Sequence, residues 1–225
     1  MRIIPAILTS DQNELINQLN YISEFTDEVD IDVMDNIFVP HNSITIEEIP
    51  ILSNIIFNFD LMVQDPESFI QKIIIQKSKG LRVDRIFVHI ESKYDLEKIC
   101  QMAKDNFNLG FSLTIPTAIE NFIDIVGKVK TYIPNKVPAL QLKTVQIGGQ
   151  GNPYHPEVLG KISKARTSGF NGDIYIDGGM DPDTIMSIKN YEIAGVSVGA
   201  YISKSSDPMR AYTQLRNATW KSRID

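Results

Sequence analysis

Apolar and polar positions follow two different spacings in turn along this chain. Short apolar runs bounded by polar turns are followed by longer stretches in which apolar residues recur at helical spacing. The short runs are typical of buried strands, and the longer stretches are typical of amphipathic helices. Eight runs predict strands at 3–8, 28–33, 55–60, 85–90, 110–113, 139–145, 173–177 and 195–198.

The clearest helical stretches lie at 11–25, 66–77, 93–106, 156–168, 182–189 and 208–220. Three of them open on an Asp-Pro pair, at Asp65, Asp181 and Asp207. In such a pair the aspartate can cap the helix N-terminus, and proline fits the first helical position. Strand and helix alternate without a Gly/Ser-rich linker, which predicts one domain over residues 1–225, a closed (β/α)8 barrel.

An open doubly wound sheet is the alternative that the same alternation allows. Such a sheet would be favoured by a glycine-rich dinucleotide loop after the first strand. The segment from Leu8 to Asp11 contains no glycine, which argues against that fold. The chain has 225 residues, of which 43% are hydrophobic, enough for one sizeable core.

Charge and cysteine content narrow the set of partners. The formal net charge is -6, and no Lys/Arg cluster is dense enough to neutralise a run of nucleic-acid phosphates. No stretch of 18 consecutive apolar residues occurs, so we expect no membrane span. With Cys100 as its single cysteine and no signal-peptide pattern, the chain is expected to be a soluble cytoplasmic protein.

Four aspartates are predicted to meet at one rim of the barrel, at the carboxyl ends of its strands, where barrels of this kind carry their chemistry. Asp30 and Asp32 alternate within the second strand, so they share its inward face. Asp60 ends the third strand and Asp177 the seventh. Asp35 could belong with them, or it could cap a helix or face solvent.

Clustered carboxylates have two physical outcomes. A divalent cation accepts their oxygens, or at least one pKa rises until a proton is shared. Either arrangement suits acid/base chemistry, since two carboxylates on opposite sides of a carbon next to a carbonyl can remove its proton from one face and return one to the other.

Glycine-bearing turns follow three consecutive late strands and are candidates for phosphate binding by backbone N–H groups. They contain Gly148 to Gly151, then Gly178 and Gly179, then Gly199 with Ala200. Glycine also serves tight turns, but three such turns in succession favour an anion site.

The same residues carry a resemblance to the ribulose-phosphate 3-epimerase family. The matching segments occur in order over about residues 5 to 200, and they are Pro5 to Leu8, Asp30 to Asp35, Phe38 to Pro40, Asp60 to Met62 and Ile176 to Gly179. The resemblance implies that Asp32 and Asp177 exchange the C3 proton of a phosphorylated ketose. It also implies a rim metal, held here by Asp30, Asp32, Asp60 and Asp177, and it allows a homo-oligomer.

This sequence departs from the family pattern at the site itself. The two metal-ligand histidines of the family fall on Asp30 and Asp60, its early serine on Ala6, and its later serine on Ala200. Lys143 stands where relatives usually have a methionine. An all-oxygen site would favour Mg or Mn over the Zn or Fe that the resemblance implies. Lys143 could also supply the positive charge, in which case the metal would be absent.

Three further residues are expected to contact the substrate. Met34 and Met62 match methionines that line the intermediate in relatives, and His89 lies on the inward face of the fourth strand. Two other functions remain open beside the epimerase. One is a phosphosugar lyase or decarboxylase, although the D-x-K-x-x-D motif of such enzymes is missing from the second strand. The other is a non-catalytic phosphosugar-binding barrel.

Overall fold

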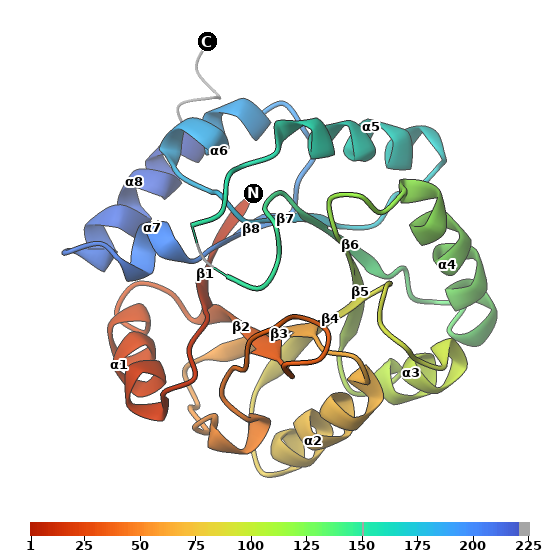
Figure 1. Ribbon diagram of the computed structural model, residues 1–225, viewed down its shortest axis with the longest axis horizontal. Helices are drawn as coiled ribbons and strands as arrows, with labels where there is room; N and C mark the ends of the chain where they lie inside the picture. Colours follow the sequence, from red (N-terminus) through yellow and green to blue (C-terminus); the bar gives the residue numbers. More distant parts are fainter. Residues whose placement is uncertain (150, 221–225) are drawn as a thin grey trace.

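The computed structural model describes residues 1–149 and 151–220, which form a closed barrel of eight parallel strands surrounded by helices (Figure 1). The predicted (β/α)8 fold is therefore confirmed. The strands pair in chain order, and β1 closes the barrel on β8. They are β1 (Arg2–Ile7), β2 (Glu28–Met34), β3 (Ile56–Met62), β4 (Val83–His89), β5 (Asn108–Leu113), β6 (Ala139–Lys143), β7 (Ile174–Asp177) and β8 (Gly195–Val198).

The helices lie on the outside of the barrel (Figure 1). They are α1 (Gln12–Ile22), α2 (Pro66–Ser78), α3 (Leu96–Ala103), α4 (Ile119–Tyr132), α5 (Gly160–Thr167), α6 (Pro182–Ile188), α7 (Ala200–Ser203) and α8 (Pro208–Trp220), with short 3-10 helices η1 (Ile46–Glu48) and η2 (Pro156–Leu159). The stretch predicted as one helix at 156–168 is thus divided into η2 and α5.

The three Asp-Pro starts behave differently. The Asp181 carboxylate accepts a hydrogen bond from the Thr184 amide at 2.8 Å, and Asp207 accepts one from the Arg210 amide at 2.9 Å. Asp65 makes no capping hydrogen bond, although α2 still begins at Pro66. The predicted order of N-cap Asp65 and first helical residue Pro66 is therefore confirmed, and only the side-chain hydrogen bond of the cap is missing.

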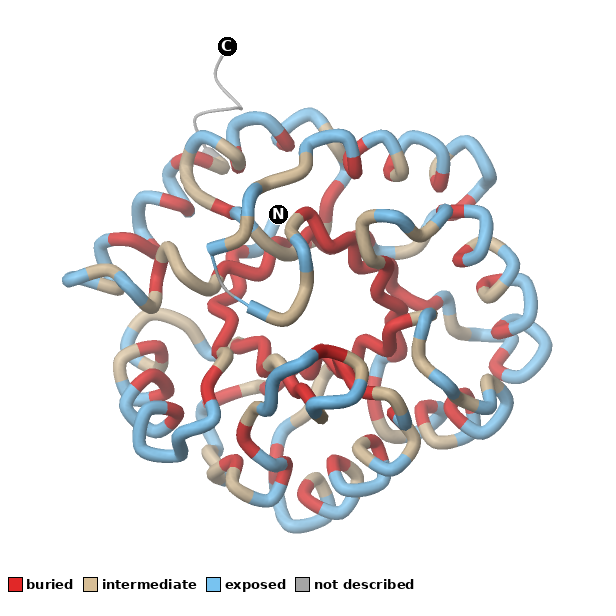
Figure 2. The backbone as a smooth tube through the Cα atoms, viewed as in Figure 1, coloured by how far each residue is buried: buried red, intermediate tan, exposed pale blue. Residues whose placement is uncertain are grey.

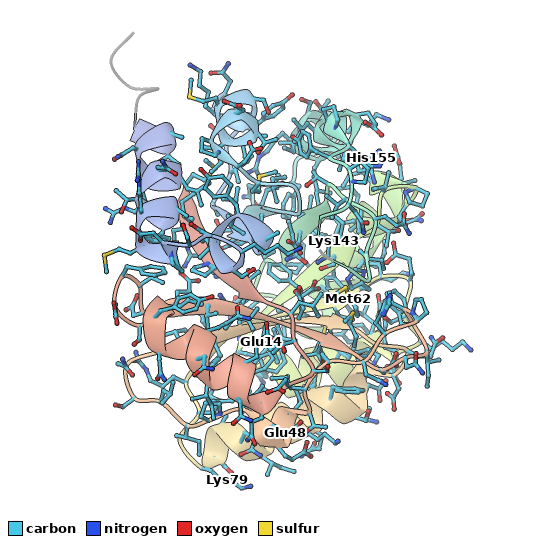
Figure 3. All side chains as sticks on the ribbon, turned by 60° about the vertical axis from the view of Figure 1, so that its left-hand side comes forward. Glu14, Glu48, Met62, Lys79, Lys143 and His155 are labelled. Atoms are coloured by element: carbon cyan, nitrogen blue, oxygen red, sulfur yellow. The ribbon has the colours of Figure 1, made fainter. Side chains whose placement is uncertain are left out.

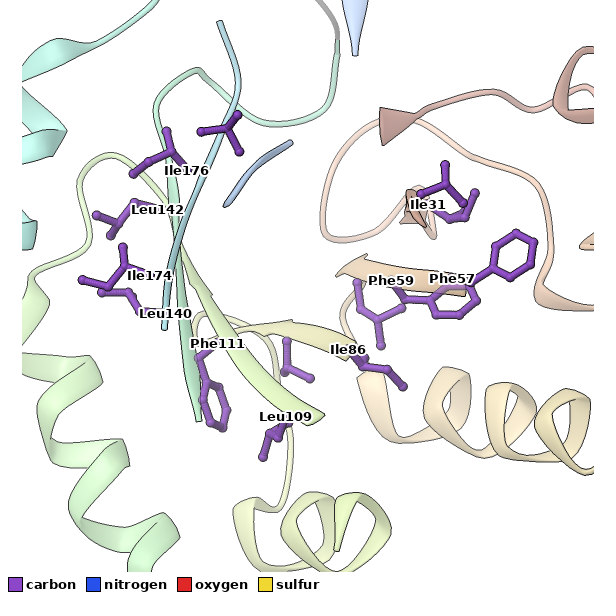
Figure 4. Packing of buried hydrophobic residues seen from close by; sticks show 14 of the residues in the cluster. Ile31, Phe57, Phe59, Ile86, Leu109, Phe111, Leu140, Leu142, Ile174 and Ile176 are labelled. Carbon is purple, nitrogen blue, oxygen red and sulfur yellow. The ribbon is translucent and has the colours of Figure 1, made fainter. Parts of the chain in front are cut away.

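The main apolar core lies between the strands and the helices. Alternate strand residues such as Leu140, Leu142, Ile174 and Ile176 are fully buried in this layer (Figure 4). The helices turn buried faces inward and exposed faces outward, while the strands are buried almost throughout (Figure 2). This alternation leaves the opposite residue of each strand to face the barrel interior.

The barrel interior is largely polar. Its inward residues include Asp30, Asn58, Ser112, Gln141 and Lys143, all less than 5% exposed. An apolar plug of Ile4, Phe87, Ala139 and Tyr175 accompanies them. Among the described helices, none combines the length and apolar character needed to cross a lipid bilayer.

Candidate functional site

A cavity of about 480 Å³ opens at the carboxyl ends of the strands. Its floor contains Asp32, Asp177, Lys143 and Met62, and its wall includes the glycine turns that follow β6, β7 and β8. Lys143 and Met62 are marked inside the barrel in Figure 3. The cavity therefore lies at the end of the barrel where sequence reasoning expected the site.

Three carboxylates meet at this end of the barrel, and two of them, Asp32 and Asp177, line the cavity. Strand register places Asp32 of β2 beside Asp60 of β3, and oxygens of Asp32, Asp60 and Asp177 lie within 4.8 Å of one another. Lys143, the register neighbour of Asp177, donates hydrogen bonds from its Nζ to carboxylate oxygens of both Asp60 and Asp177. We call these four residues the upper cluster.

Burial and neighbouring charges together set the pKa values within the upper cluster. Desolvation raises the pKa of Asp32 well above its usual range, and the negative charge of Asp177 adds to that effect. Desolvation would also raise the pKa of Asp60, but Lys143 and His89 outweigh it and hold that pKa below the ordinary value. Burial would lower the pKa of Lys143, yet the surrounding carboxylates raise it, so the ammonium remains charged.

The Asp60 carboxylate has partners on two sides. Its Oδ2 accepts from Lys143, while its Oδ1 lies 3.3 Å from His89 Nε2 and accepts from Ser112 Oγ at 3.3 Å. His89 Nδ1 in turn lies 3.6 Å from Glu91 Oε2. Asp60 is thus fixed between a lysine and a histidine and carries its negative charge.

Asp30 does not join the upper cluster. Its carboxylate accepts hydrogen bonds from Asn58 Nδ2 at 2.9 Å and from Ser197 Oγ. Two residues along a strand correspond to roughly 6.6 Å, so Asp30 lies one layer deeper than Asp32 although both face inward. The expectation that four aspartates converge is corrected to three. We call Asp30, Asn58 and Ser197 the lower cluster.

His89 and Met34 do not line the cavity. The His89 ring is fully buried behind Asp60 and packs against Phe38, with ring centroids 5.1 Å apart. Met34 packs with Val39 and Met62 under the loop that follows β2. Of the three residues expected to contact the substrate, Met62 lines the cavity, and Met34 and His89 lie behind its lining.

The glycine turns all reach the cavity. Gly148, Gly151, Gly178 and Gly179 line it and have positive φ angles, and Gly199 and Ala200 line it at the start of α7. A Cβ at Gly178 would lie 2.3 Å from Val145 Cγ2, and its φ of 105° is one that glycine adopts readily. Gln150, within the first of these turns, lies outside the described residues.

Asp35 serves the loop after β2. Its Oδ1 accepts from the amides of Ile37 and Phe38 at 2.9 and 2.8 Å, and its Oδ2 accepts from the Gln64 amide at 2.6 Å. All three contacts are to backbone N–H groups. Of the two roles left open for Asp35, the structure therefore favours a local capping role, in which it holds the Phe38 loop against β3.

The three converging carboxylates could hold a metal ion, and their all-oxygen donor set would suit Mg or Mn. The residues around them do not fit a resident dication, however. Two of the three carboxylates already bind the Lys143 ammonium, whose side chain is 3% exposed. A divalent cation at the same point would face that ammonium at close range and would have to compete with it for the same oxygens.

Several residues of this site escaped sequence reasoning. Asn58 and Ser197 hold Asp30, and Thr144 donates from its Oγ1 to the carbonyls of Asp177 and Gly178 at 3.0 and 2.7 Å. The period of two offered a signal for Asn58, which lies two residues before Asp60 on the same strand face. The same alternation places Ser197 on the inward face of β8, but its partner Asp30 is 167 residues away and cannot be identified from spacing.

Comparisons with known proteins point to one family. The family model described as Ribulose-phosphate 3 epimerase family matches residues 2–202. The chain is 25% identical to the cytoplasmic isoform of ribulose-phosphate 3-epimerase from Oryza sativa subsp. japonica, with 96% of this chain and 93% of the relative covered. It is also 25% identical to ribulose-phosphate 3-epimerase from Helicobacter pylori, over 96% of this chain and 97% of the relative.

Solved structures share the fold at lower identity. The 3-hexulose-6-phosphate synthase of Salmonella typhimurium has a TM-score of 0.70 at 14% identity, over 98% of this chain and 99% of that one. KGPDC from Streptococcus mutans in complex with D-R5P has a TM-score of 0.65 at 10% identity, with 97% of each chain covered. Because the family model matches residues 2–202, most of the chain, this protein belongs to the ribulose-phosphate 3-epimerase family.

Proposed function

We propose that this protein epimerises C3 of a ketose phosphate, such as ribulose 5-phosphate, by proton transfer between two carboxyl groups. The observation that carries the proposal is that Asp32 and Asp177 face one cavity, from β2 and β7, at the same end of the barrel as the glycine turns. One end of the substrate would meet acid/base groups, and the other would meet backbone donors.

The reaction requires one carboxylate and one carboxylic acid. The carboxylate removes the C3 proton, the electron pair of the broken bond moves toward C2, and an enediolate forms. The acid on the other side then delivers a proton to the opposite face of C3. Burial raises the pKa of both Asp32 and Asp177, but the hydrogen bond from Lys143 opposes that rise at Asp177, so Asp32 is assigned as the acid and Asp177 as the base.

The phosphate of the substrate is assigned to the glycine turns. Gly178, Gly179 and Gly199 line the cavity beside Asp177, and backbone N–H groups at such turns and at helix N-termini bind anions. Because Ala200 lacks the hydroxyl of the family's serine, the phosphate would be bound at this position by backbone N–H groups. The relative in complex with D-R5P supports a sugar phosphate as the ligand.

Deuterium exchange provides the test. Ribulose 5-phosphate is incubated with the protein in D2O, and incorporation of deuterium at C3 is followed by NMR together with the appearance of xylulose 5-phosphate. Exchange with epimerisation is expected. A phosphorylated hexulose in parallel determines whether the substrate class is the pentulose or the hexulose. A protein that binds either sugar phosphate without exchange would instead be a binding barrel, and loss of a carbon fragment would indicate a lyase.

A matched pair of variants tests the role of Asp177. Asp177→Asn is expected to abolish exchange, since the amide cannot remove a proton. Asp173→Asn changes an exposed aspartate just before β7, at the opposite end of that strand from the cavity, and should leave exchange unchanged. Equal loss in both variants would contradict the assignment.

A further inference from the structure

The position of Lys143 deserves a functional explanation of its own. A lysine side chain that is 3% exposed is rare unless its charge is paired. Here it is paired twice, with Asp60 and with Asp177. It also lines the cavity, so its ammonium faces the space that the substrate would occupy. A purely structural ion pair would not need access to that space.

The neighbours of Lys143 hold the ammonium at the meeting point of the upper cluster. Asp60 is fixed from behind by His89 and Ser112, so its Oδ2 remains directed at Lys143. Asp177 is the register neighbour of Lys143 on β7, and the Thr144 side chain holds the backbone after it. The positive charge is therefore set in place by four strands before any ligand arrives.

The residues at the metal-ligand positions of the family pattern are not arranged around a common point in this chain. The resemblance to the family put two imidazole ligands at positions 30 and 60. In this chain, Asp30 is directed away to Asn58 and Ser197, and Asp60 is bound to Lys143. Only Asp32 and Asp177 have their carboxylates beside the cavity, and one of these already accepts from the ammonium.

We propose that the Lys143 ammonium takes the place of a divalent cation at this site and makes the epimerisation independent of metal. The proposal rests on the function proposed above. When the C3 proton is removed, the negative charge that develops on the C2 oxygen is stabilised by a hydrogen bond from Lys143 Nζ. The lysine keeps its protons throughout, and the two carboxyl groups alone exchange the C3 proton, so atoms and charge balance.

The first experiment uses the unmodified protein. Purified full-length protein is analysed for metals by mass spectrometry, and C3 deuterium exchange is measured with and without a strong chelator. We expect substoichiometric metal and an exchange rate that the chelator does not change. Stoichiometric divalent metal, or activity that the chelator removes and added metal restores, would overturn the proposal.

The second experiment asks whether Lys143 excludes a cation. Lys143→Met replaces the ammonium with a neutral side chain, and binding of Mn²⁺ alone is followed by electron paramagnetic resonance. We expect Mn²⁺ to bind the variant and not the parent, since Asp60 and Asp177 are then free of the ammonium. The matched control is Lys161→Met, because Lys161 Nζ donates to the carbonyls of Thr114 and Ile115 outside the upper cluster. Equal Mn²⁺ binding by parent and Lys143→Met would contradict the proposal.

The two proposals can fail separately. A parent protein that shows no exchange with any sugar phosphate, with or without metal, would overturn the epimerase assignment, whereas the Mn²⁺ comparison would still decide the role of Lys143. If Lys143→Met does not fold, the metal content and chelator response of the parent remain decisive. Borohydride added with the substrate provides a further check, since a covalent adduct on Lys143 would mean that it attacks a carbonyl and does not act as a fixed charge.

Discussion

The lower and upper clusters of the barrel interior hold buried carboxylates in two different ways. In the lower cluster, Asp30 is bound by the neutral donors Asn58 and Ser197, and its pKa rises to about 7 because burial outweighs those hydrogen bonds. In the upper cluster, Lys143 supplies a full positive charge to Asp60 and Asp177. Asp30 and Asp32, two aspartates on one face of β2, therefore lie in two clusters that differ in charge.

The comparison distinguishes carboxyl groups that are held by neutral hydrogen-bond donors from carboxyl groups that are expected to take part in the reaction. A carboxyl group held by neutral donors can take up a proton without leaving a charge unpaired, so a neutral side chain could replace it. A carboxyl group in the upper cluster balances a buried ammonium and faces the cavity. Its loss is expected to affect both charge balance and proton transfer. Three measurements test this distinction, in order of decreasing expected effect, and a fourth tests Glu91, which lies behind the upper cluster beside His89.

The first prediction compares Asp32→Asn with Asp30→Asn. Asp32→Asn should lower the rate of C3 exchange by about 10²- to 10⁴-fold, because one of the two proton-transfer groups is removed. Asp30→Asn keeps the size of the side chain and should leave the rate within about threefold, since Asp30 has no access to the cavity. Rates are measured by deuterium incorporation. A comparable loss in both variants would mean that the two clusters act as one unit.

The second prediction concerns the stability of the upper cluster. Lys143→Met should lower the free energy of unfolding by about 3–5 kcal/mol, because it leaves buried carboxylates without their cation. Denaturant titration at pH 8 measures the loss. Adding Asp60→Asn to the same chain should recover part of it, since one unpaired charge disappears. A double variant no more stable than Lys143→Met would show that the charge imbalance is not the cause.

The third prediction follows from the raised pKa of Asp30. A folded-state pKa near 7 against an ordinary 3.8 means that the folded protein holds the proton more tightly, so this group costs stability as pH rises from about 4 to about 7. Asp30→Asn should therefore gain stability relative to the parent across that window, by at most about 4 kcal/mol, and the difference should be constant above pH 7. A flat difference between pH 4 and 7 would show that Asp30 is charged throughout.

The fourth prediction has the smallest expected effect and the opposite sign. The nearby His89 ring and hydrogen bonds from Thr114 and Thr117 outweigh burial and lower the pKa of Glu91 to about 2. Its contribution is thus present above pH 4.5 and is lost as pH falls toward 2. Glu91→Gln should cost about 1 kcal/mol at neutral pH, a figure reduced for the partial exposure of the carboxylate. Denaturation of both proteins at pH 3 and pH 7 checks that the gap narrows at the lower pH.

The sequence predicted the barrel well because buried parallel strands read as short apolar runs. It also placed Asp32, Asp177 and the glycine turns at one end, since strand ends and a period of two are visible in a linear sequence. The depth of Asp30 could not be predicted in this way. Its level relative to Asp177 depends on how the strands are staggered around the barrel, and its partner Ser197 lies on β8.

The role of Lys143 illustrates the same limit. Sequence reasoning identified it as a cation at the rim, yet its contact with Asp60 spans 83 residues and four strands. The division of 156–168 into η2 and α5 was equally hidden, because the helical spacing of apolar residues does not distinguish an α-helix from a preceding 3-10 turn. The local pattern of apolar residues predicts helices and strands. The packing of those elements then determines which side chains come into contact.

Closure of the barrel has a consequence for how the chain folds. The partner of Arg2 across the final seam is Gly195, so β1 keeps an unpaired edge until β8 has been synthesised. During translation, at roughly 5–20 residues per second, that edge would wait on the order of ten seconds or more for β8. Nascent chains arrested before β8 should therefore be the species most prone to aggregation and most dependent on chaperones.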